Sequence, residues 1–405
     1  MRWLLALTIL GCGATPDAAP DAGHTPPPRQ TELRAAAVTV DVTPEPGVEI
    51  VGFGRRTSTA VRDPLFGAVL VVASPSGVVA IVTLDVPGIF EWHAQLIRGQ
   101  VAAAVGVGVE QVVVAASHTH SAPMLGDDAW SRRTMDALAD AARRARETLA
   151  PAWLGVGRAE VGFCVNRRLA VDGVVRAAPN PEGPVDPRIR VLRLATPEGA
   201  PIATVTHAVC HPNLLLGAES TAISADFPGE ARARLDDPWL FLPGAAGDVR
   251  PLTVDAEGEF RLATDAEVRD VGRTLAEATE AAPAAPAPVH GDAIDSATTR
   301  LDLTRRDDRP MSVELSAHRV GDVTLVTIPG EPFVDIGLTV ERRVLAEGLA
   351  GEVIVIGYAN GYADYIVTPE AEPLGGYEVE RSLLPPTAAA EIEDALVALA
   401  RQVAP

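Results

Sequence analysis

Short apolar runs separated by turn residues form the main pattern of the sequence from residue 33 onward. Three pairs of such runs predict β-hairpins over 68–84, 189–209 and 313–328, because each pair flanks a short segment that contains Gly. The second hairpin leads directly into His211, and the third leads into Glu331. Polar side chains therefore follow the predicted return strands, which suggests that these strands share one polar mouth.

Helical spacing of apolar residues separates the predicted strands in other parts of the chain. It predicts helices over 90–105, over 128–149 with Asp128 as the N-cap, and over 388–402. Single apolar runs predict three further strands, over 33–47, 112–116 and 352–356. The segments 170–186 and 281–289 are predicted to be loops or linkers. Together these elements predict an α/β fold with mixed β-sheets built from hairpins and flanked by helices.

The first residues have the pattern of a targeting segment. Arg2 precedes a short apolar stretch that ends in Ile-Leu-Gly-Cys, which resembles a lipobox. We therefore predict a lipoprotein-type signal over 1–12 with lipidation at Cys12, although the short apolar stretch also suits an ordinary secretory signal. Residues 13–32 are rich in Ala, Pro and Asp and predict a disordered tether. The body, residues 33–405, is then an exported protein: a cell-envelope lipoprotein, facing the outer membrane or the periplasm, or a secreted protein.

Composition and charge narrow the classes of partner. The chain carries a formal net charge of −20 and contains no lysine. Such an acidic protein is a poor binder of nucleic acid, so no nucleic-acid partner is expected, and membrane contact is expected only through the lipid anchor. In an exported protein, Cys164 and Cys210 can either form a disulfide or remain as two buried thiols.

Two histidines that follow the predicted strand over 112–116 are the first candidates for chemistry. His118 and His120 are two residues apart, so in extended backbone their side chains point the same way. Such a pair suits a metal ion, or a ligand with a proton-transfer partner, but it equally suits loop histidines bound to backbone carbonyls. His207 and His211 are four residues apart, yet they lie in a predicted strand, so we interpret His207 as a core residue.

Several short motifs, in this order, resemble the neutral/alkaline non-lysosomal ceramidases, a family of zinc-dependent amide hydrolases. The motifs are SHTHSAP (117–123), NRR (166–168), CHP (210–212), SADFPG (224–229), GAAGDVRP (244–251), IPGEPF (328–333), GYANGYADYIVTPE (357–370) and GGYE (375–378). The resemblance spans roughly residues 33–405 and implies a layered sandwich in that body.

The resemblance also implies a role for each matching residue. It implies Zn²⁺ held by four residues: His118, His211, Glu331 and Tyr365. It further implies that His120 transfers protons and that Arg167 and Tyr377 contact the substrate carbonyl region. These residue types fit the chemistry, because imidazoles and carboxylates bind zinc, which activates water near neutral pH. Asp248 is interpreted either as a group that orients a histidine or as a carboxylate that binds loop amides.

One departure from the family pattern bears on the mechanism. The ceramidases have a serine after Gly-Asp-Val, whereas this chain has Arg250. We therefore expect metal-activated water, with His120 as general base, to hydrolyse amide bonds of a small lipid-like, ceramide-like or other N-acyl substrate, and ester bonds less readily. The alternative hypothesis is a non-catalytic surface lipoprotein that retains a structural zinc site. A binding module without metal is a third hypothesis.

Overall fold

The computed structural model describes residues 32–405 except 53, 216–219, 236–237, 283–284 and 287–291. The predicted signal with Cys12 and all but the last residue of the predicted tether lie outside these residues and stay predictions. In the described part of the chain, no helix combines the length and the apolar character needed to cross a bilayer.

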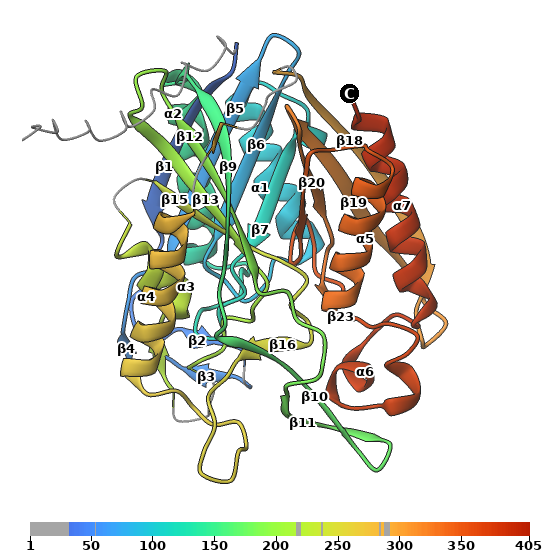
Figure 1. The fold of residues 1–405 in the computed structure, drawn as a ribbon. Coiled ribbons are helices and arrows are strands. Elements are labelled where there is room, and N and C mark those ends of the chain that lie inside the picture. Colours follow the sequence, from blue (N-terminus) through green and yellow to red (C-terminus); the bar gives the residue numbers. More distant parts are fainter. Residues whose placement is uncertain (1–31, 53, 216–219, 236–237, 283–284, 287–291) are drawn as a thin grey trace, which may run out of the picture.

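Three large sheets, wrapped on the outside by helices, make up the body of the molecule (Figure 1). The first has the strand order β7-β6-β5-β1-β8, with β1 Arg34–Asp41, β5 Phe66–Ser74, β6 Gly77–Leu84, β7 Val112–Ala116 and β8 Ala150–Pro151. The second has the order β15-β13-β12-β9-β17, with β9 Trp153–Glu160, β12 Arg188–Ala195, β13 Pro201–Ala208, β15 Trp239–Pro243 and β17 Ala285–Pro286. The third has the order β18-β19-β20-β22, with β18 Ile294–Thr304, β19 Pro310–Val320, β20 Val323–Thr327 and β22 Glu352–Ile356.

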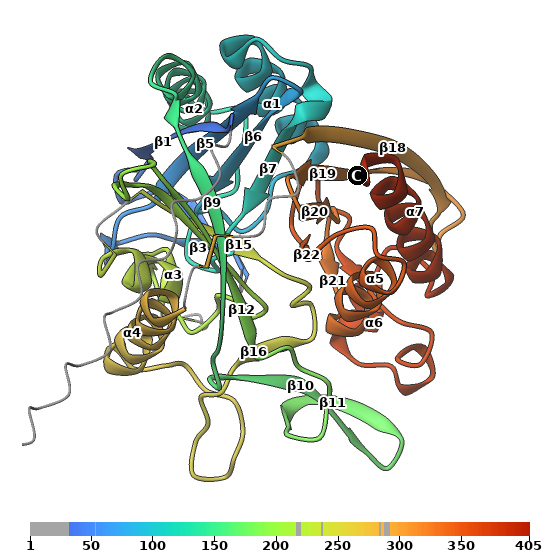
Figure 2. The same cartoon turned by 45° about the horizontal axis from the view of Figure 1, so that its top comes forward.

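Each large sheet carries its own helices on its outer face, as Figure 2 shows. The first sheet is covered by α1 Glu91–Val105 and α2 Ala129–Glu147, the second by α3 Asp226–Arg232 and α4 Asp265–Ala281, and the third by α5 Val334–Ala346 and α7 Thr387–Val403. The inner faces of the sheets pack on one another in a core that includes Leu70, Val205 and Leu325, one residue from each sheet. Burial of this apolar surface is the main force that holds the layers together. The predicted layered α/β architecture is therefore confirmed.

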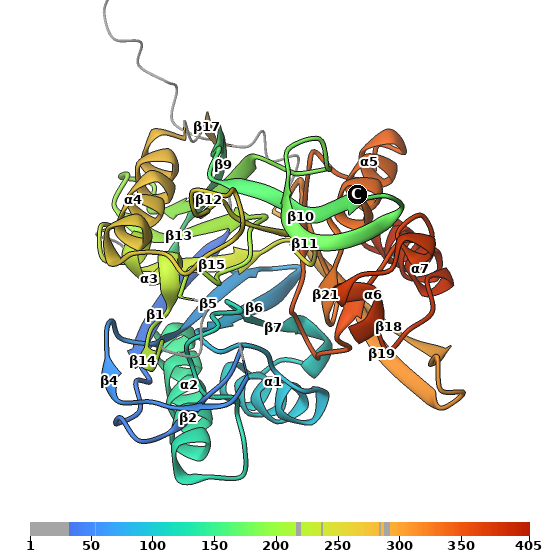
Figure 3. The same cartoon turned by 90° about the horizontal axis from the view of Figure 1, so that it is seen from below.

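Mixed pairing explains why the strand ends point the same way. The three predicted hairpins are antiparallel: β5 pairs with β6, β12 with β13, and β19 with β20. Beyond each hairpin the next neighbour is parallel, because β7 lies on β6, β15 on β13 and β22 on β20. Smaller strands and a short helix gather beneath these ends, as the view from below shows (Figure 3). They are β2 Glu49–Ile50, β3 Arg56–Thr57, β4 Ala60–Val61, β10 Cys164–Val171, β11 Val174–Asn180, β14 Ala222–Ile223, β16 Val249–Pro251, β21 Glu331–Pro332, β23 Tyr365–Ile366 and α6 Tyr377–Arg381.

The predicted helices form with nearly the expected ends. Asp128 caps α2, and its carboxylate accepts a hydrogen bond from the Ser131 amide at 2.9 Å. The prediction of a loop over 170–186 was wrong, because β10 and β11 form an antiparallel hairpin there. Its turn is Asp172-Gly173, with φ of 53° and 81°. Left-handed backbone at both turn positions suits Asp-Gly and matches the twist of the strands.

Candidate metal centre and active site

Three strand ends, one from each large sheet, deliver the central polar side chains. His118 follows β7, His211 follows β13, and Glu331 opens β21 shortly after β20. All three side chains are buried. The expectation that these exits share a mouth agrees with where the structure places them.

His118 and His120 meet, but not by the alternation that the sequence suggested. β7 ends at Ala116, and His118 has a left-handed backbone with φ of 68°. This conformation is uncommon outside glycine, although His adopts it more readily than most residues. The two Nε2 atoms lie 3.2 Å apart, so the turn, rather than an extended strand, brings the rings together.

The imidazole nitrogens and one carboxylate oxygen converge on a single point. The Nε2 atom of His211 lies 2.8 Å from that of His118 and 3.1 Å from that of His120. The Oε2 atom of Glu331 lies 3.3 Å from His118 Nε2 and 3.5 Å from His211 Nε2. This oxygen is buried and makes no hydrogen bond. Such a set of buried donor atoms facing one another can hold a metal ion.

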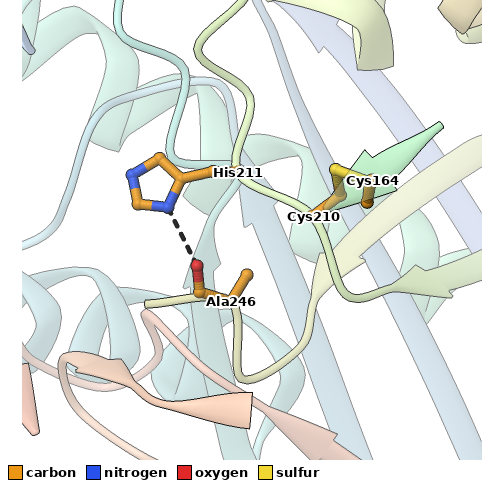
Figure 4. The surroundings of a disulfide bond; sticks show 4 residues. All are labelled: Cys164, Cys210, His211 and Ala246. Atoms are coloured by element: carbon orange, nitrogen blue, oxygen red, sulfur yellow. Dashed lines mark hydrogen bonds between the residues drawn. A yellow bond between two sulfur atoms is a disulfide. The ribbon is translucent and has the colours of Figure 1, made fainter. Parts of the chain in front are cut away.

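The other ring nitrogens distinguish the histidines. Nδ1 of His118 bonds to the Pro87 carbonyl, and Nδ1 of His211 bonds to the Ala246 carbonyl at 3.0 Å (Figure 4). A carbonyl accepts a hydrogen bond from the protonated Nδ1, so the lone pair on Nε2 faces the centre, as a metal ligand requires. Nδ1 of His120 is buried without a hydrogen-bond partner, so its tautomer is not fixed in this way.

Burial and neighbouring charges set the protonation of the centre. Burial, and then the charge of His118, hold the pKa of both His120 and His211 well below the ordinary value, so both rings are neutral at neutral pH. Burial, the largest single influence, would raise the pKa of Glu331, but attraction to His118 together with hydrogen bonds from His118 and Tyr362 and the charge of Arg167 lowers that pKa overall. His120 and His211 are thus neutral, while Glu331 stays ionised.

Arg167 forms hydrogen bonds that join Tyr365 to Gly247 and Glu378. Its Nη2 donates to the Tyr365 hydroxyl at 2.9 Å and to the Gly247 carbonyl at 2.6 Å, while Nε donates to Glu378 at 2.8 Å. Tyr365 lies directly opposite Glu331 in the parallel pair β21–β23. Burial, and then the charge of Glu331, raise the pKa of Tyr365 well above 10, so a nearby cation would be needed to ionise it.

Comparison with solved structures identifies the fold. The crystal structure of the neutral ceramidase from Pseudomonas aeruginosa matches with a TM-score of 0.75 and 19% identity, over 92% of this chain and 74% of that one. The fold is that of a neutral ceramidase. A structure described as ceramidase complexed with C2 gives the same TM-score and identity, over 92% of this chain and 75% of that chain.

Sequence comparison covers much less of the ceramidase fold. No family model matches the sequence. The neutral ceramidase of Mycobacterium tuberculosis (strain ATCC 25618 / H37Rv) is 37% identical over 60 residues, which are 14% of this chain and 9% of that protein. The chain therefore spans only a small part of the curated relative that it matches.

In this ceramidase fold, a cavity of about 1060 Å³ opens onto the metal centre. Its lining includes the polar residues His118, His120, Glu331, Tyr362 and Tyr365, the charged residues Glu49, Arg55, Asp128, Asp364 and Arg381, and the apolar residues Pro87, Phe90, Pro123, Met124, Leu125 and Trp130. Tyr377 lies at the cavity surface, 56% exposed, with its ring edge-on to that of Tyr365 at 5.8 Å. The cavity thus combines polar and apolar lining residues, as sites for amphipathic ligands do.

Asp248 is placed away from the histidines. Its carboxylate accepts hydrogen bonds from the Val334 amide at 2.8 Å and from Asn166 Nδ2 at 3.0 Å. No hydrogen bond or ion pair joins it to a histidine among the described residues. Its contacts are thus those of a carboxylate bound to amides, the second of the two interpretations of Asp248. Burial raises its pKa to about 7.

Three further side chains contact the centre without having been assigned from the sequence. The ring of Tyr358 stacks on His118 with centroids 4.2 Å apart, and Arg56 donates from Nη2 to the His120 carbonyl at 2.7 Å. Glu378 pairs with both Arg167 and Arg168. The GGYE motif contains Glu378, but only the fold shows that two neighbouring arginines share it. His207 lies outside the centre and bonds to the Val355 carbonyl at 2.9 Å, as expected for a core residue.

A disulfide ties two parts of the site together. Cys164 opens β10, the strand of Arg167, and it pairs with Cys210, which precedes His211 (Figure 4). The sequence left the choice between a disulfide and free thiols open, and the structure shows the disulfide.

We expect the Cys164→Ser/Cys210→Ser double variant to unfold at a lower urea concentration than the wild type. The two cysteines are 46 residues apart, and closing a loop of that length stabilises a fold by about 4 kcal/mol in the chain-entropy model. Urea unfolding followed by circular dichroism measures the change. Cys12→Ser is the control, because it leaves the disulfide intact and should not move the midpoint. An equal midpoint in the double variant would contradict the expectation.

Proposed function

We propose that this chain is a zinc-dependent hydrolase that cleaves the amide bond of N-acyl substrates. The observation that carries the proposal is the convergence of three buried Nε2 atoms and Glu331 Oε2 within 3.5 Å at the base of a cavity. In the reaction, water gives its hydroxyl to the acyl carbon and a proton to the nitrogen, so the products are a carboxylic acid and an amine.

The donor set suits zinc. His118 and His211 would hold the ion through Nε2, since their Nδ1 atoms are bound to carbonyls. Glu331 would add its free oxygen, and Tyr365, opposite Glu331 in the strand pair, would complete the set. Neutral imidazoles and oxygen atoms are ordinary zinc ligands, and a catalytic zinc site keeps a further position open for water. When bound, zinc supplies Lewis-acid polarisation of the reacting groups.

The remaining polar groups suit proton transfer and charge stabilisation. His120 has no carbonyl on Nδ1 and lines the cavity, so it is free to take a proton from water and return it to the leaving amine. Arg167 donates to the Tyr365 hydroxyl at the same base, where its charge would stabilise an oxyanion. Tyr377, at the cavity surface, would position the substrate near its carbonyl. The apolar lining residues suit an acyl chain, as in a ceramide-like substrate.

The direct test combines metal analysis with turnover. The full chain, purified without added metal or chelator, is expected to contain about one zinc per chain. It is expected to hydrolyse N-acyl amides, to lose this activity with a chelator and to regain it with Zn²⁺ but not with Mg²⁺, which prefers oxygen ligands. Zinc without turnover would favour the non-catalytic lipoprotein instead. No metal binding even after zinc is added would contradict the proposal.

A further inference from the structure

Arg250 lies beside the candidate metal centre, but the proposed mechanism gives it no role. It lies in β16, opposite Val165 of β10. The residues just before it hold the site, since the Val249 carbonyl accepts from the His211 amide at 3.2 Å and the Asp248 carbonyl accepts from the Arg167 amide at 2.9 Å. These backbone hydrogen bonds therefore hold Arg250 close to His211 and Arg167.

Arg250 is buried and forms no ion pair among the described residues, and the attraction of Asp226 offsets only part of the cost of its burial. Its side chain belongs to a residue that is only 4% exposed, and its Nε and Nη2 atoms are buried with no hydrogen-bond partner. Its guanidinium lies over the Phe260 ring, 4.2 Å from the centroid. The buried residues Arg98 and Arg190, by contrast, each pair with carboxylates.

The guanidinium of Arg250 stays positively charged at neutral pH. Burial, and then repulsion from Arg167, lower the pKa of Arg250 to about 10, which still leaves it protonated at neutral pH. Burying a cation without a paired carboxylate is unfavourable, so an unpaired buried guanidinium suggests a ligand that is not part of the fold. Its charge also acts on His120, which places it within electrostatic reach of the proposed proton-transfer group.

The two free nitrogens indicate the chemistry of the missing partner. Nε and Nη2 form one edge of the guanidinium, and they present parallel N–H groups that match the two oxygens of a planar carboxylate. The nearby Arg167 is already bonded to Glu378, Gly247 and Tyr365, so a single positive charge is free for a ligand. A single planar guanidinium matches the charge of one carboxylate, whereas a phosphate carries more negative charge.

We propose that Arg250 binds a carboxylate that the substrate carries close to its scissile amide. The preferred substrates are then N-acyl amino acids, whose hydrolysis gives a fatty acid and a free amino acid, rather than N-acyl amino alcohols. The inference rests on the proposed hydrolase function and specifies its substrate class. In this proposal Arg250 determines which substrates are preferred, and the Phe260 ring packs against the face of its guanidinium group.

A matched pair of substrates tests the proposal in the zinc-loaded full chain. N-lauroylglycine and N-lauroylethanolamine have the same acyl chain and amide, but only the first has a carboxylate. The wild type is expected to prefer N-lauroylglycine by about tenfold or more in kcat/KM. In Arg250→Met this substrate should lose about tenfold, mainly through KM, while N-lauroylethanolamine changes by less than about threefold. Arg250→Lys should retain part of the preference.

Two readouts separate a binding role from a structural one. Arg250→Met should have a melting temperature equal to or above that of the wild type, because it removes an unpaired buried charge. A loss that is equal for both substrates, an unchanged preference, or a lower melting temperature in Arg250→Met would overturn the proposal.

If the wild type hydrolyses neither substrate, the proposed function fails, and calorimetry of N-lauroylglycine binding then decides the role of Arg250 alone. Binding that is about tenfold weaker in Arg250→Met supports it. Equal affinity, or no binding to either protein, overturns it.

Discussion

His118→Ala is expected to remove the metal from the protein and to abolish hydrolysis. The variant loses one Nε2 ligand and leaves Glu331 Oε2 and His211 Nε2 facing a gap. We expect zinc to fall from about one ion per chain to a small fraction, and kcat to fall by about a thousandfold or more. Elemental analysis and turnover of an N-acyl amide measure the two effects, and circular dichroism checks that the variant is folded.

His207→Gln is the matched control for the loss of a buried histidine. His207 is as deeply placed as the ligands, but its Nε2 bonds to the Val355 carbonyl and does not face the centre. A glutamine amide can donate to the same carbonyl, so this variant should keep both its zinc and its turnover. Full activity in His118→Ala, or equal loss of zinc in both variants, would show that the histidines do not form the site.

Arg167→Met is expected to reduce both turnover and stability. The change removes the bond to the Tyr365 hydroxyl and the positive charge at the base of the cavity. Losing one well-placed charge donor costs about a hundredfold to a thousandfold in kcat. It also leaves Glu378 with one arginine instead of two, which should cost about 3 kcal/mol in the free energy of unfolding.

Arg168→Met separates these two effects. Arg168 binds the other oxygen of Glu378 at 2.5 Å and the Gly375 carbonyl at 2.7 Å, but it has no hydrogen bond to Tyr365. It should therefore lose a similar amount of stability and retain kcat within about tenfold of the wild type. Urea unfolding and steady-state kinetics give both numbers. Equal kcat losses in the two variants would assign Arg167 a structural role only.

The parts of the fold that the sequence predicted best are those with apolar strands and plain turns. The hairpins over 68–84, 189–209 and 313–328 formed because alternating apolar residues bury one or both faces, and because Gly-containing turns close them. The β10–β11 hairpin was missed because its outer strand, Val174–Asn180, is only partly buried and its apolar residues come in adjacent pairs, so it has little apolar alternation. The Asp172-Gly173 pair was the available signal, since this dipeptide favours the left-handed turn found there.

The candidate site was predictable in its residue types but not in its geometry. Resemblance to a family directed attention to His118, His211 and Glu331, and the fold places them together. The local reason was different from the one expected, because a left-handed turn at His118 depends on packing that one sequence does not reveal. Tyr358 stacks on that ring because the segment after β22 lies beside β7, where the Ala116 amide donates to the Tyr358 carbonyl, a long-range contact without any sequence signal.

The division of the ligands among three sheets has a consequence for folding. One ligand follows the first sheet, one the second and one the third, so no single sheet can form the centre alone. The free energy of binding an ion would then be available only to the complete native state and would add to the free energy of global unfolding. The three layers already share an apolar core, and a bound ion would couple them further.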